Sequence, residues 1–151
     1  GYGFVGLYME DTIQVEEEPY FGYMRGALTC EELKEADAYA EIFGIELRPF
    51  IQTLAHLNQI VRYEEYQKII DTDDILLVED PRTKTLLEHL IRTVSKNFSS
   101  KKINIGMDEA HMVGLGKYLD RVPESSGNYA ETSRDGAFHL QTIWIYGTDV
   151  E

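Results

Sequence analysis

The apolar positions along the chain predict an alternation of short strands and helices. Apolar runs over 4–8, 45–51 and 103–107 are typical of strands, and the first reads as a buried strand. Between these runs, apolar residues recur at helical spacing over 31–43 and again over 83–97. Strands that alternate with helices of this length form parallel βαβ units. The pattern therefore predicts an α/β fold with a parallel sheet.

Capping residues mark the ends of these two helices. Thr29 can accept a hydrogen bond from the free N–H groups at the start of the first helix, and Gly44 suits the left-handed position that follows its last turn. Asp80 and Pro81 make a comparable start for the second helix. We therefore expect both helices to begin and end close to these residues.

The alternation stops after Leu119. Residues 123–136 are polar and rich in turn-forming residues, and residues 137–147 could form one strand. We therefore divide the chain into a domain over 1–121 and an unmatched tail over 122–151. Such a tail is what a frame interruption or another non-native continuation would produce.

Composition narrows the class of protein. A chain of 151 residues that is 43% hydrophobic and 27% charged is typical of one soluble globular domain with its own core. Its 27 acidic and 14 basic residues give a net charge of −13, which repels a phosphate backbone, so we expect no nucleic-acid partner. No apolar run is long enough to predict a membrane span. No signal peptide is visible, and the sequence does not decide between a cytoplasmic and a secreted protein.

One cysteine, Cys30, limits the chemistry further. It cannot form a disulfide within the chain or build a multi-cysteine zinc site. No histidine stands near it in the sequence to activate its thiol, so we read it as structural.

Polar and titratable residues follow all three predicted strands. In a parallel sheet or barrel the carboxyl ends of the strands meet at one edge, and active sites lie there. We therefore expect these side chains to gather on one rim. They are Glu10, Asp11, His56, Asp108, Glu109 and His111. Each has a simpler structural interpretation, because carboxylates after strands often cap helices and a lone loop histidine is often only hydrogen-bonded. The run Glu16–Glu18 reads as solvated surface.

Three segments resemble one enzyme family in order and spacing. NIGMDEA, residues 104–110, resembles the signature that ends the fourth barrel strand of family 20 glycoside hydrolases, the β-N-acetylhexosaminidases. LYMEDT, 7–12, resembles the second-strand motif of that family, and FGIELRPFIQTLAHL, 43–57, resembles the third-strand motif with its loop histidine. PYFGYMRGALTCEELKEADAYA, 19–40, fits the stretch between them. The resemblance covers residues 4–121 and is strongest to the bacterial exo-acting N-acetylglucosaminidases.

The resemblance implies a partial (β/α)8 TIM barrel covering about strands 2 to 4. A complete barrel takes about 250 residues, so the chain is expected to be a fragment of the catalytic domain, and activity of the 151-residue piece alone is doubtful. The implied activity is hydrolysis of terminal non-reducing N-acetyl-β-D-hexosamine residues by a retaining, substrate-assisted mechanism. The implied partners are glycans that end in N-acetylglucosamine or N-acetylgalactosamine, and the implied reaction uses no cofactor and no metal.

The resemblance also assigns roles to individual residues. Glu109 matches the general acid, and Asp108 matches the residue that orients the substrate's acetamido group. His56 and Asp11 match a supporting pair in which a carboxylate holds the histidine. The residues expected to bind substrate are Glu10 and His111. The chain departs from the family at Gln52, where many members have an aspartate.

Two alternative functions remain open from the residues alone. A metal-dependent TIM-barrel hydrolase could use His56, Asp108 and His111 as ligands, because mixed histidine and carboxylate ligands suit zinc or manganese. A non-catalytic α/β interaction domain could instead bind a cationic partner through its acidic rim.

Overall fold

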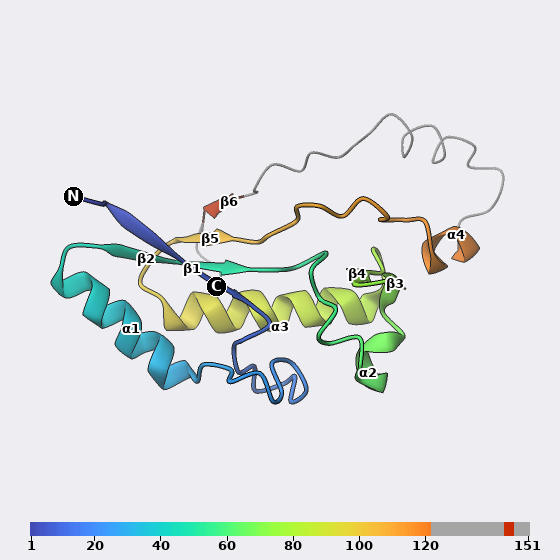
Figure 1. Ribbon diagram of the computed structural model, residues 1–151, viewed down its shortest axis with the longest axis horizontal. Coiled ribbons are helices and arrows are strands. Elements are labelled where there is room, and N and C mark those ends of the chain that lie inside the picture. Colours follow the sequence, from blue (N-terminus) through green and yellow to red (C-terminus); the bar gives the residue numbers. More distant parts are fainter. Residues whose placement is uncertain (122–143, 147–151) are drawn as a thin grey trace.

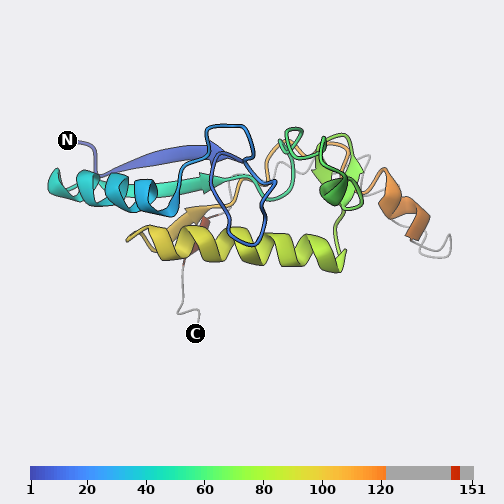
Figure 2. The same ribbon diagram turned by 90° about the horizontal axis from the view of Figure 1, so that it is seen from below.

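The computed structural model describes residues 1–121 and 144–146. In chain order the elements are β1 (Phe4–Glu10), α1 (Cys30–Ile42), β2 (Glu46–Ile51), α2 (Glu64–Gln67), β3 (Ile70–Thr72), β4 (Ile75–Leu76), α3 (Pro81–Asn97), β5 (Lys102–Asn104), α4 (Lys117–Arg121) and β6 (Trp144–Tyr146). Figure 1 shows α1 and α3 on the same side of the main sheet, and Figure 2 shows these two helices from below.

The three predicted strands are parallel neighbours. The main sheet has the order β1-β2-β5-β6, in which β2 pairs in parallel with β1 on one side and with β5 on the other. β6 pairs antiparallel with β5, which places Ile145 opposite Ile103. Because a (β/α)8 barrel contains only parallel neighbours, β6 does not continue the barrel pattern. The described chain is therefore an α/β fold with a small, mainly parallel sheet.

Both predicted helices are present, and their predicted ends are confirmed. At the start of α1 the Glu32 N–H donates to Thr29 Oγ1 at 3.1 Å, and the Thr29 N–H donates to Glu32 Oε2 at 2.8 Å, which is a complete capping box. Gly44 follows α1 with a φ of 65°, a conformation that glycine adopts without strain. At the start of α3 the Arg82 N–H donates to Asp80 Oδ1 at 2.9 Å.

β1 is more exposed than its apolar sequence predicts. Phe4, Val5 and Tyr8 are 43%, 44% and 57% exposed, and Met9 is buried. β1 is an edge strand of the described sheet, and the helices cover only one of the two faces of that sheet. The prediction of a buried strand is therefore wrong for the described residues.

The core lies between the sheet and the helices. α1 contributes Leu33, α3 contributes Leu86 and Leu90, and β2 contributes Leu47 and Ile51. Burial of an aliphatic side chain of this size stabilises the fold by about 1.5–3 kcal/mol. In the sequence, α2 and the antiparallel hairpin of β3 and β4 come between β2 and α3. The sequence pattern predicted neither of them.

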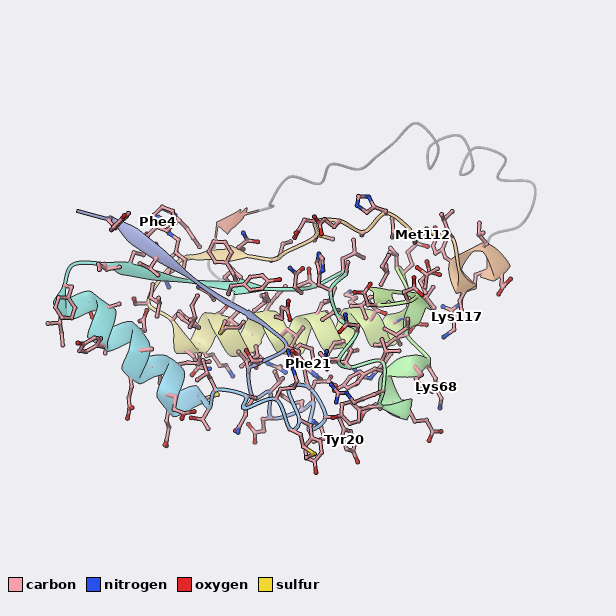
Figure 3. The ribbon with its side chains drawn as sticks, viewed as in Figure 1. Phe4, Tyr20, Phe21, Lys68, Met112 and Lys117 are labelled. Carbon is pink, nitrogen blue, oxygen red and sulfur yellow. The ribbon has the colours of Figure 1, made fainter. Side chains whose placement is uncertain are left out.

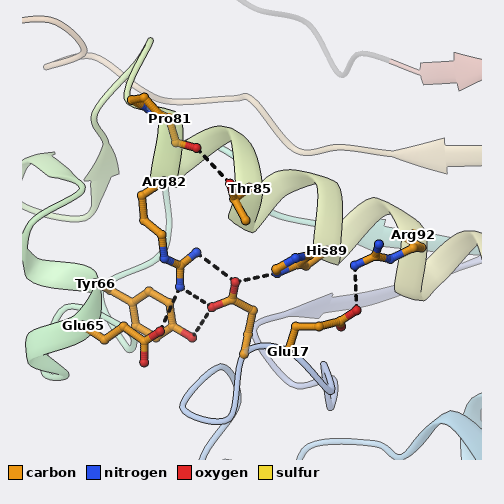
Figure 4. A network of polar contacts seen from close by, with 9 residues as sticks. Glu17, Glu65, Tyr66, Pro81, Arg82, Thr85, His89 and Arg92 are labelled. Atoms are coloured by element: carbon orange, nitrogen blue, oxygen red, sulfur yellow. Dashed lines mark hydrogen bonds and ion pairs between the residues drawn. The ribbon is translucent and has the colours of Figure 1, made fainter.

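A buried carboxylate joins the loop between β1 and α1 to the helices (Figure 4). Glu18 is 1% exposed and accepts hydrogen bonds from Arg82 Nη1 at 2.8 Å and from the Tyr66 hydroxyl at 3.1 Å. His89 Nδ1 lies 2.8 Å from the same carboxylate. The interpretation of Glu18 as solvated surface is therefore wrong, because partners on α2 and α3 replace its water. Its neighbour Glu17 is exposed, as expected.

These contacts set the ionisation of Glu18. Burial raises the pKa of the Glu18 carboxyl, but hydrogen bonds from Arg82 and His89 outweigh burial and leave that pKa below its ordinary value. A group whose pKa is lower in the folded state stabilises the fold above its unfolded pKa. That stabilisation is lost as the pH falls through the folded pKa of Glu18.

We predict that Glu18→Gln lowers the free energy of unfolding at pH 7 by about 3 kcal/mol. This is the low end of the range for a broken buried ion pair, because Arg82 keeps Glu65 as a partner at 3.0 Å. Glu17→Gln is the matched control, since Glu17 pairs with Arg92 at the surface and its loss should cost less than about 1 kcal/mol.

Urea unfolding of the two variants and the unchanged chain at pH 7 measures both effects. Repeating it at decreasing pH should shrink the gap between Glu18→Gln and the unchanged chain as Glu18 becomes protonated. Equal destabilisation by the two variants at pH 7 would show that burial of Glu18 has no energetic consequence.

Candidate active site

The carboxyl ends of the parallel strands bring the predicted loops together. β2 leads through Gln52 to His56, and β5 leads through Gly106 to the pair Asp108 and Glu109. The Thr53 hydroxyl donates to the Ile105 carbonyl oxygen at 2.7 Å, which ties these two loops to each other. The sheet therefore delivers both polar segments to one edge, as the strand alternation predicts.

His56 lies against both carboxylates of the loop after β5. Its Nε2 is 3.4 Å from Glu109 Oε2 and 3.8 Å from Asp108 Oδ2. The side chains of His56, Asp108 and Glu109 are 33%, 46% and 68% exposed, so a substrate can reach all three. An imidazole between two accessible carboxylates provides groups that can give, take and orient protons.

The residues at the end of β1 gather around Arg25. Asp11 is buried, and its Oδ1 accepts a hydrogen bond from Arg25 Nε at 3.3 Å. Arg25 Nη2 also lies 3.8 Å from Glu10 Oε2. Asp11 therefore has Arg25 as its ion-pair partner, and its predicted support of His56 stays a prediction. Arg25 comes from the long loop before α1, and no strand-end pattern pointed to it.

Tyr8 connects the ends of β1 and β2. Its hydroxyl donates to Glu10 Oε1 at 3.1 Å and accepts from Gln52 Nε2 at 3.1 Å. Burial raises the pKa of the Tyr8 hydroxyl, and the negative charges of Glu10 and Asp108 raise it further. The hydrogen bond from Gln52 lowers this pKa, but the raising effects are larger. Tyr8 therefore keeps its proton as a hydrogen-bond donor. Gln52 is buried, and within the described part of the chain its Oε1 has no hydrogen-bond partner.

Left-handed backbone conformations concentrate at this edge of the sheet. Glu10, His56 and Glu109 have φ values of 50°, 58° and 56°, and they are half of the six non-glycine residues with positive φ in the described ranges. This conformation costs an L-residue about 1–2 kcal/mol. Strained residues cluster at functional sites, where the surrounding structure holds them in place.

His111 is exposed, and its N–H donates to the Glu109 carbonyl oxygen at 2.8 Å. The metal-site alternative requires His111 to join His56 and Asp108. Over residues 1–121 and 144–146, no three histidine, cysteine, aspartate or glutamate side chains are grouped to hold a metal ion. The structure therefore does not assemble that ligand set.

No helix in the described ranges is both long and apolar enough to cross a membrane.

Comparison with known proteins identifies similar solved structures. No protein-family model matches the chain. No curated protein matches it. A β-N-acetylhexosaminidase from Bacteroides fragilis matches with a TM-score of 0.61 and 22% identity, over 71% of this chain and 26% of that one. A family 20 exo-β-N-acetylglucosaminidase from Vibrio harveyi, solved with N-acetylglucosamine, matches with a TM-score of 0.59 and 14% identity, over 71% of this chain and 22% of that one. A chitobiase from Flavobacterium johnsoniae matches with a TM-score of 0.60 and 20% identity, over 84% of this chain and 22% of that one.

These likenesses confirm the predicted resemblance at the level of the fold. The chain has the fold of part of these β-N-acetylhexosaminidases, and it spans only about a quarter of their length.

We predict that Gly106→Ala destabilises the chain more than Gly44→Ala does. Both glycines have positive φ, which costs alanine about 1–2 kcal/mol at either position. A Cβ at Gly106 would also lie 2.4 Å from the Ile51 carbonyl oxygen and 2.5 Å from Gln52 Oε1, whereas a Cβ at Gly44 would meet nothing within 4 Å. The crowding at Gly106 should add about 1–3 kcal/mol. Denaturant unfolding measures the difference, and equal losses would contradict the tight packing between β2 and β5.

Proposed function

We propose that the chain is a segment of an enzyme that removes terminal non-reducing N-acetyl-β-D-hexosamine residues from glycans. The observation that carries this proposal is the position of His56 beside Asp108 and Glu109, at the carboxyl ends of parallel strands. The fold shared with family 20 enzymes supports it, and so do the three ordered sequence motifs.

In the first step the substrate supplies its own nucleophile. The oxygen of its 2-acetamido group attacks the anomeric carbon while Glu109 gives its proton to the departing glycosidic oxygen. The carbon–oxygen bond to the leaving group breaks, and a cyclic oxazolinium intermediate forms. Asp108 holds the acetamido N–H and stabilises the positive charge of this intermediate. Glycosidases of this type need no enzyme nucleophile.

In the second step Glu109 acts as a base. Its carboxylate takes a proton from a water molecule, and that water attacks the anomeric carbon from the face that the leaving group occupied. The oxazolinium ring of the intermediate opens, and the anomeric carbon keeps its original configuration. His56, 3.4 Å from Glu109, orients the carboxylate in both steps.

The remaining residues at this edge would shape the sugar pocket. Glu10 carries a carboxylate that can accept hydrogen bonds from sugar hydroxyls. We propose that the side chain of His111 also forms a hydrogen bond with a sugar hydroxyl. The ion pair of Asp11 with Arg25 holds the loop after β1 in place beside Glu10. These contacts suit substrates that end in N-acetylglucosamine or N-acetylgalactosamine.

The reaction belongs to a longer enzyme in this proposal. The described sheet has three parallel strands, whereas a barrel of this class has eight. Residues 1–121 would form the catalytic segment, and of the proposed unmatched tail over 122–151 only β6 lies within the described residues. We expect little activity from the 151-residue chain alone, because the strands that close the sugar pocket are needed for turnover.

We predict that Glu109→Gln, made in the complete enzyme, slows the cleavage of aryl N-acetylglucosaminides with poor leaving groups by about 10²–10⁴-fold. This is the usual contribution of a general acid, and glutamine keeps the shape of glutamate without the proton. A nitrophenol leaves with less protonation, so its cleavage should lose less. Rates across a series of graded leaving-group pKa values measure this, and equal sensitivity in the variant and the unchanged enzyme would contradict the role of Glu109.

Asp108→Asn should behave differently, because it disturbs the acetamido nucleophile. We predict similar losses for good and poor leaving groups, measured on the same substrate series. A metal chelator should leave the unchanged enzyme and both variants unaffected. Inhibition by the chelator would instead favour a metal-dependent hydrolase.

A further inference from the structure

A buried carboxylate lies on the β3–β4 hairpin, which the sequence pattern did not predict. Asp71 is 7% exposed. Its Oδ2 accepts a hydrogen bond from the Gly114 N–H at 2.7 Å, and its Oδ1 accepts one from the Tyr118 N–H at 2.8 Å. A buried charge is costly unless hydrogen bonds satisfy it, and here each oxygen has a backbone N–H donor. Gly114 belongs to the loop that carries Asp108 and Glu109, and Tyr118 lies in the first turn of α4, which follows that loop.

Other contacts join the hairpin to this loop. The Thr72 hydroxyl donates to the Met112 carbonyl oxygen at 3.3 Å. Gly116 packs so closely that a Cβ there would lie 2.1 Å from the Asp71 carbonyl oxygen. Met112 and Leu115 are 47% and 39% exposed, so apolar burial of these two side chains does little to hold the loop. Polar contacts with the hairpin therefore hold the loop after Glu109, together with the apolar packing of Ala110 and Val113.

The same hairpin also holds the loop that carries His56. The Leu76 N–H donates to the Leu54 carbonyl oxygen at 2.8 Å. Leu54 and Ile75 pack with Ala110 in a small apolar cluster. One hairpin thus contacts the segments on both sides of the His56–Glu109 contact. Figure 3 draws the side chains of this region, in which Met112 and Lys117 are labelled.

We propose that Asp71, aided by Thr72, is a positioning residue that fixes Asp108 and Glu109 relative to His56. Its effect on catalysis rests on the function proposed above, but its anchoring of the loop does not. Glu109 has a left-handed backbone conformation, which persists only where the surrounding structure imposes it. Releasing the loop would let Glu109 relax away from His56, and a displacement of about 1 Å can cost about 10²-fold in rate.

Asp71→Asn tests this proposal. The amide keeps one acceptor oxygen and places an NH2 group against the second N–H donor, so one of the two bonds is lost. Asp73→Asn is the matched control, because Asp73 is exposed on the same hairpin and loses the same charge. Its φ of 40° is one that asparagine tolerates well.

The first measurement is amide hydrogen exchange in the 151-residue chain. Asp71→Asn should speed exchange by about tenfold or more at Gly114 or at Tyr118, whichever amide loses its acceptor, which is the effect of losing one hydrogen bond to a charged group. Exchange in α3 should not change, and Asp73→Asn should match the unchanged chain. Unaltered exchange at both amides would overturn the proposal, whether or not the complete enzyme cleaves glycans.

The second measurement is kinetic and uses the complete enzyme. Asp71→Asn should lower kcat for poor leaving groups by about 10²-fold, with KM changed less than about threefold and with a smaller loss for a nitrophenol leaving group. Faster exchange without a loss in kcat would overturn the positioning role. If the unchanged enzyme cleaves no N-acetylhexosaminide, the proposed function fails. The exchange result alone then decides whether Asp71 holds the loop after Glu109.

A second variant covers the case in which Asp71→Asn does not fold. Thr72→Val removes only the hydrogen bond to the Met112 carbonyl oxygen and keeps the shape of the side chain. It should give a smaller loss of the same kind, in kcat and mainly for poor leaving groups. No loss, or a loss that falls on KM alone, would overturn the proposal.

Discussion

Parallel pairing of β2 with β1 and β5 is the constraint on which the candidate site depends. It forces three chain segments to leave the sheet at the same edge, although they are separated by up to about ninety residues in the sequence. Each connection must then return the chain to the start of a strand, and α1 and α3 do this on one side of the sheet. The polar residues that follow the strands meet because of this topology.

Buried carboxylates hold the connections that the sheet alone would leave loose. Glu18 joins the loop after β1 to α2 and α3, and Asp71 joins the loop after β5 to the β3–β4 hairpin. Breaking such a buried interaction costs more than losing a surface ion pair, because the remaining partner stays away from water. In the proposed positioning role of Asp71, the strained backbone at Glu109 is supported by contacts that lie outside the site itself.

Local signals predicted the parts of this structure that local interactions determine. The caps at Thr29 and Asp80 follow from residues next to each helix end. The parallel pairing of the strands follows from their alternation with helices along the chain. The placement of His56 beside Asp108 and Glu109 agrees with the topological rule for strand ends, while the catalytic roles of these residues remain predictions.

The features that the sequence analysis predicted wrongly or missed depend mostly on contacts between segments that are distant in the sequence. The burial of Glu18 depends on Arg82, sixty-four positions away, and the pairing of Asp11 with Arg25 depends on how a long loop folds back. β3 and β4 have three and two residues, too few to show a period. The exposure of β1 depends on what covers the sheet, which the alternation of apolar residues does not encode.

In the function that we propose, the substrate's own acetamido oxygen is the nucleophile at the Asp108–Glu109 edge of the sheet. The most direct measurement compares aryl glucosaminides in the complete enzyme whose N-acyl group carries zero, one, two or three fluorine atoms. Each fluorine withdraws electrons from the acyl oxygen, so we expect kcat/KM to fall steeply across the series. A rate that does not depend on fluorine content would contradict substrate assistance and would require a nucleophile from the enzyme or from water.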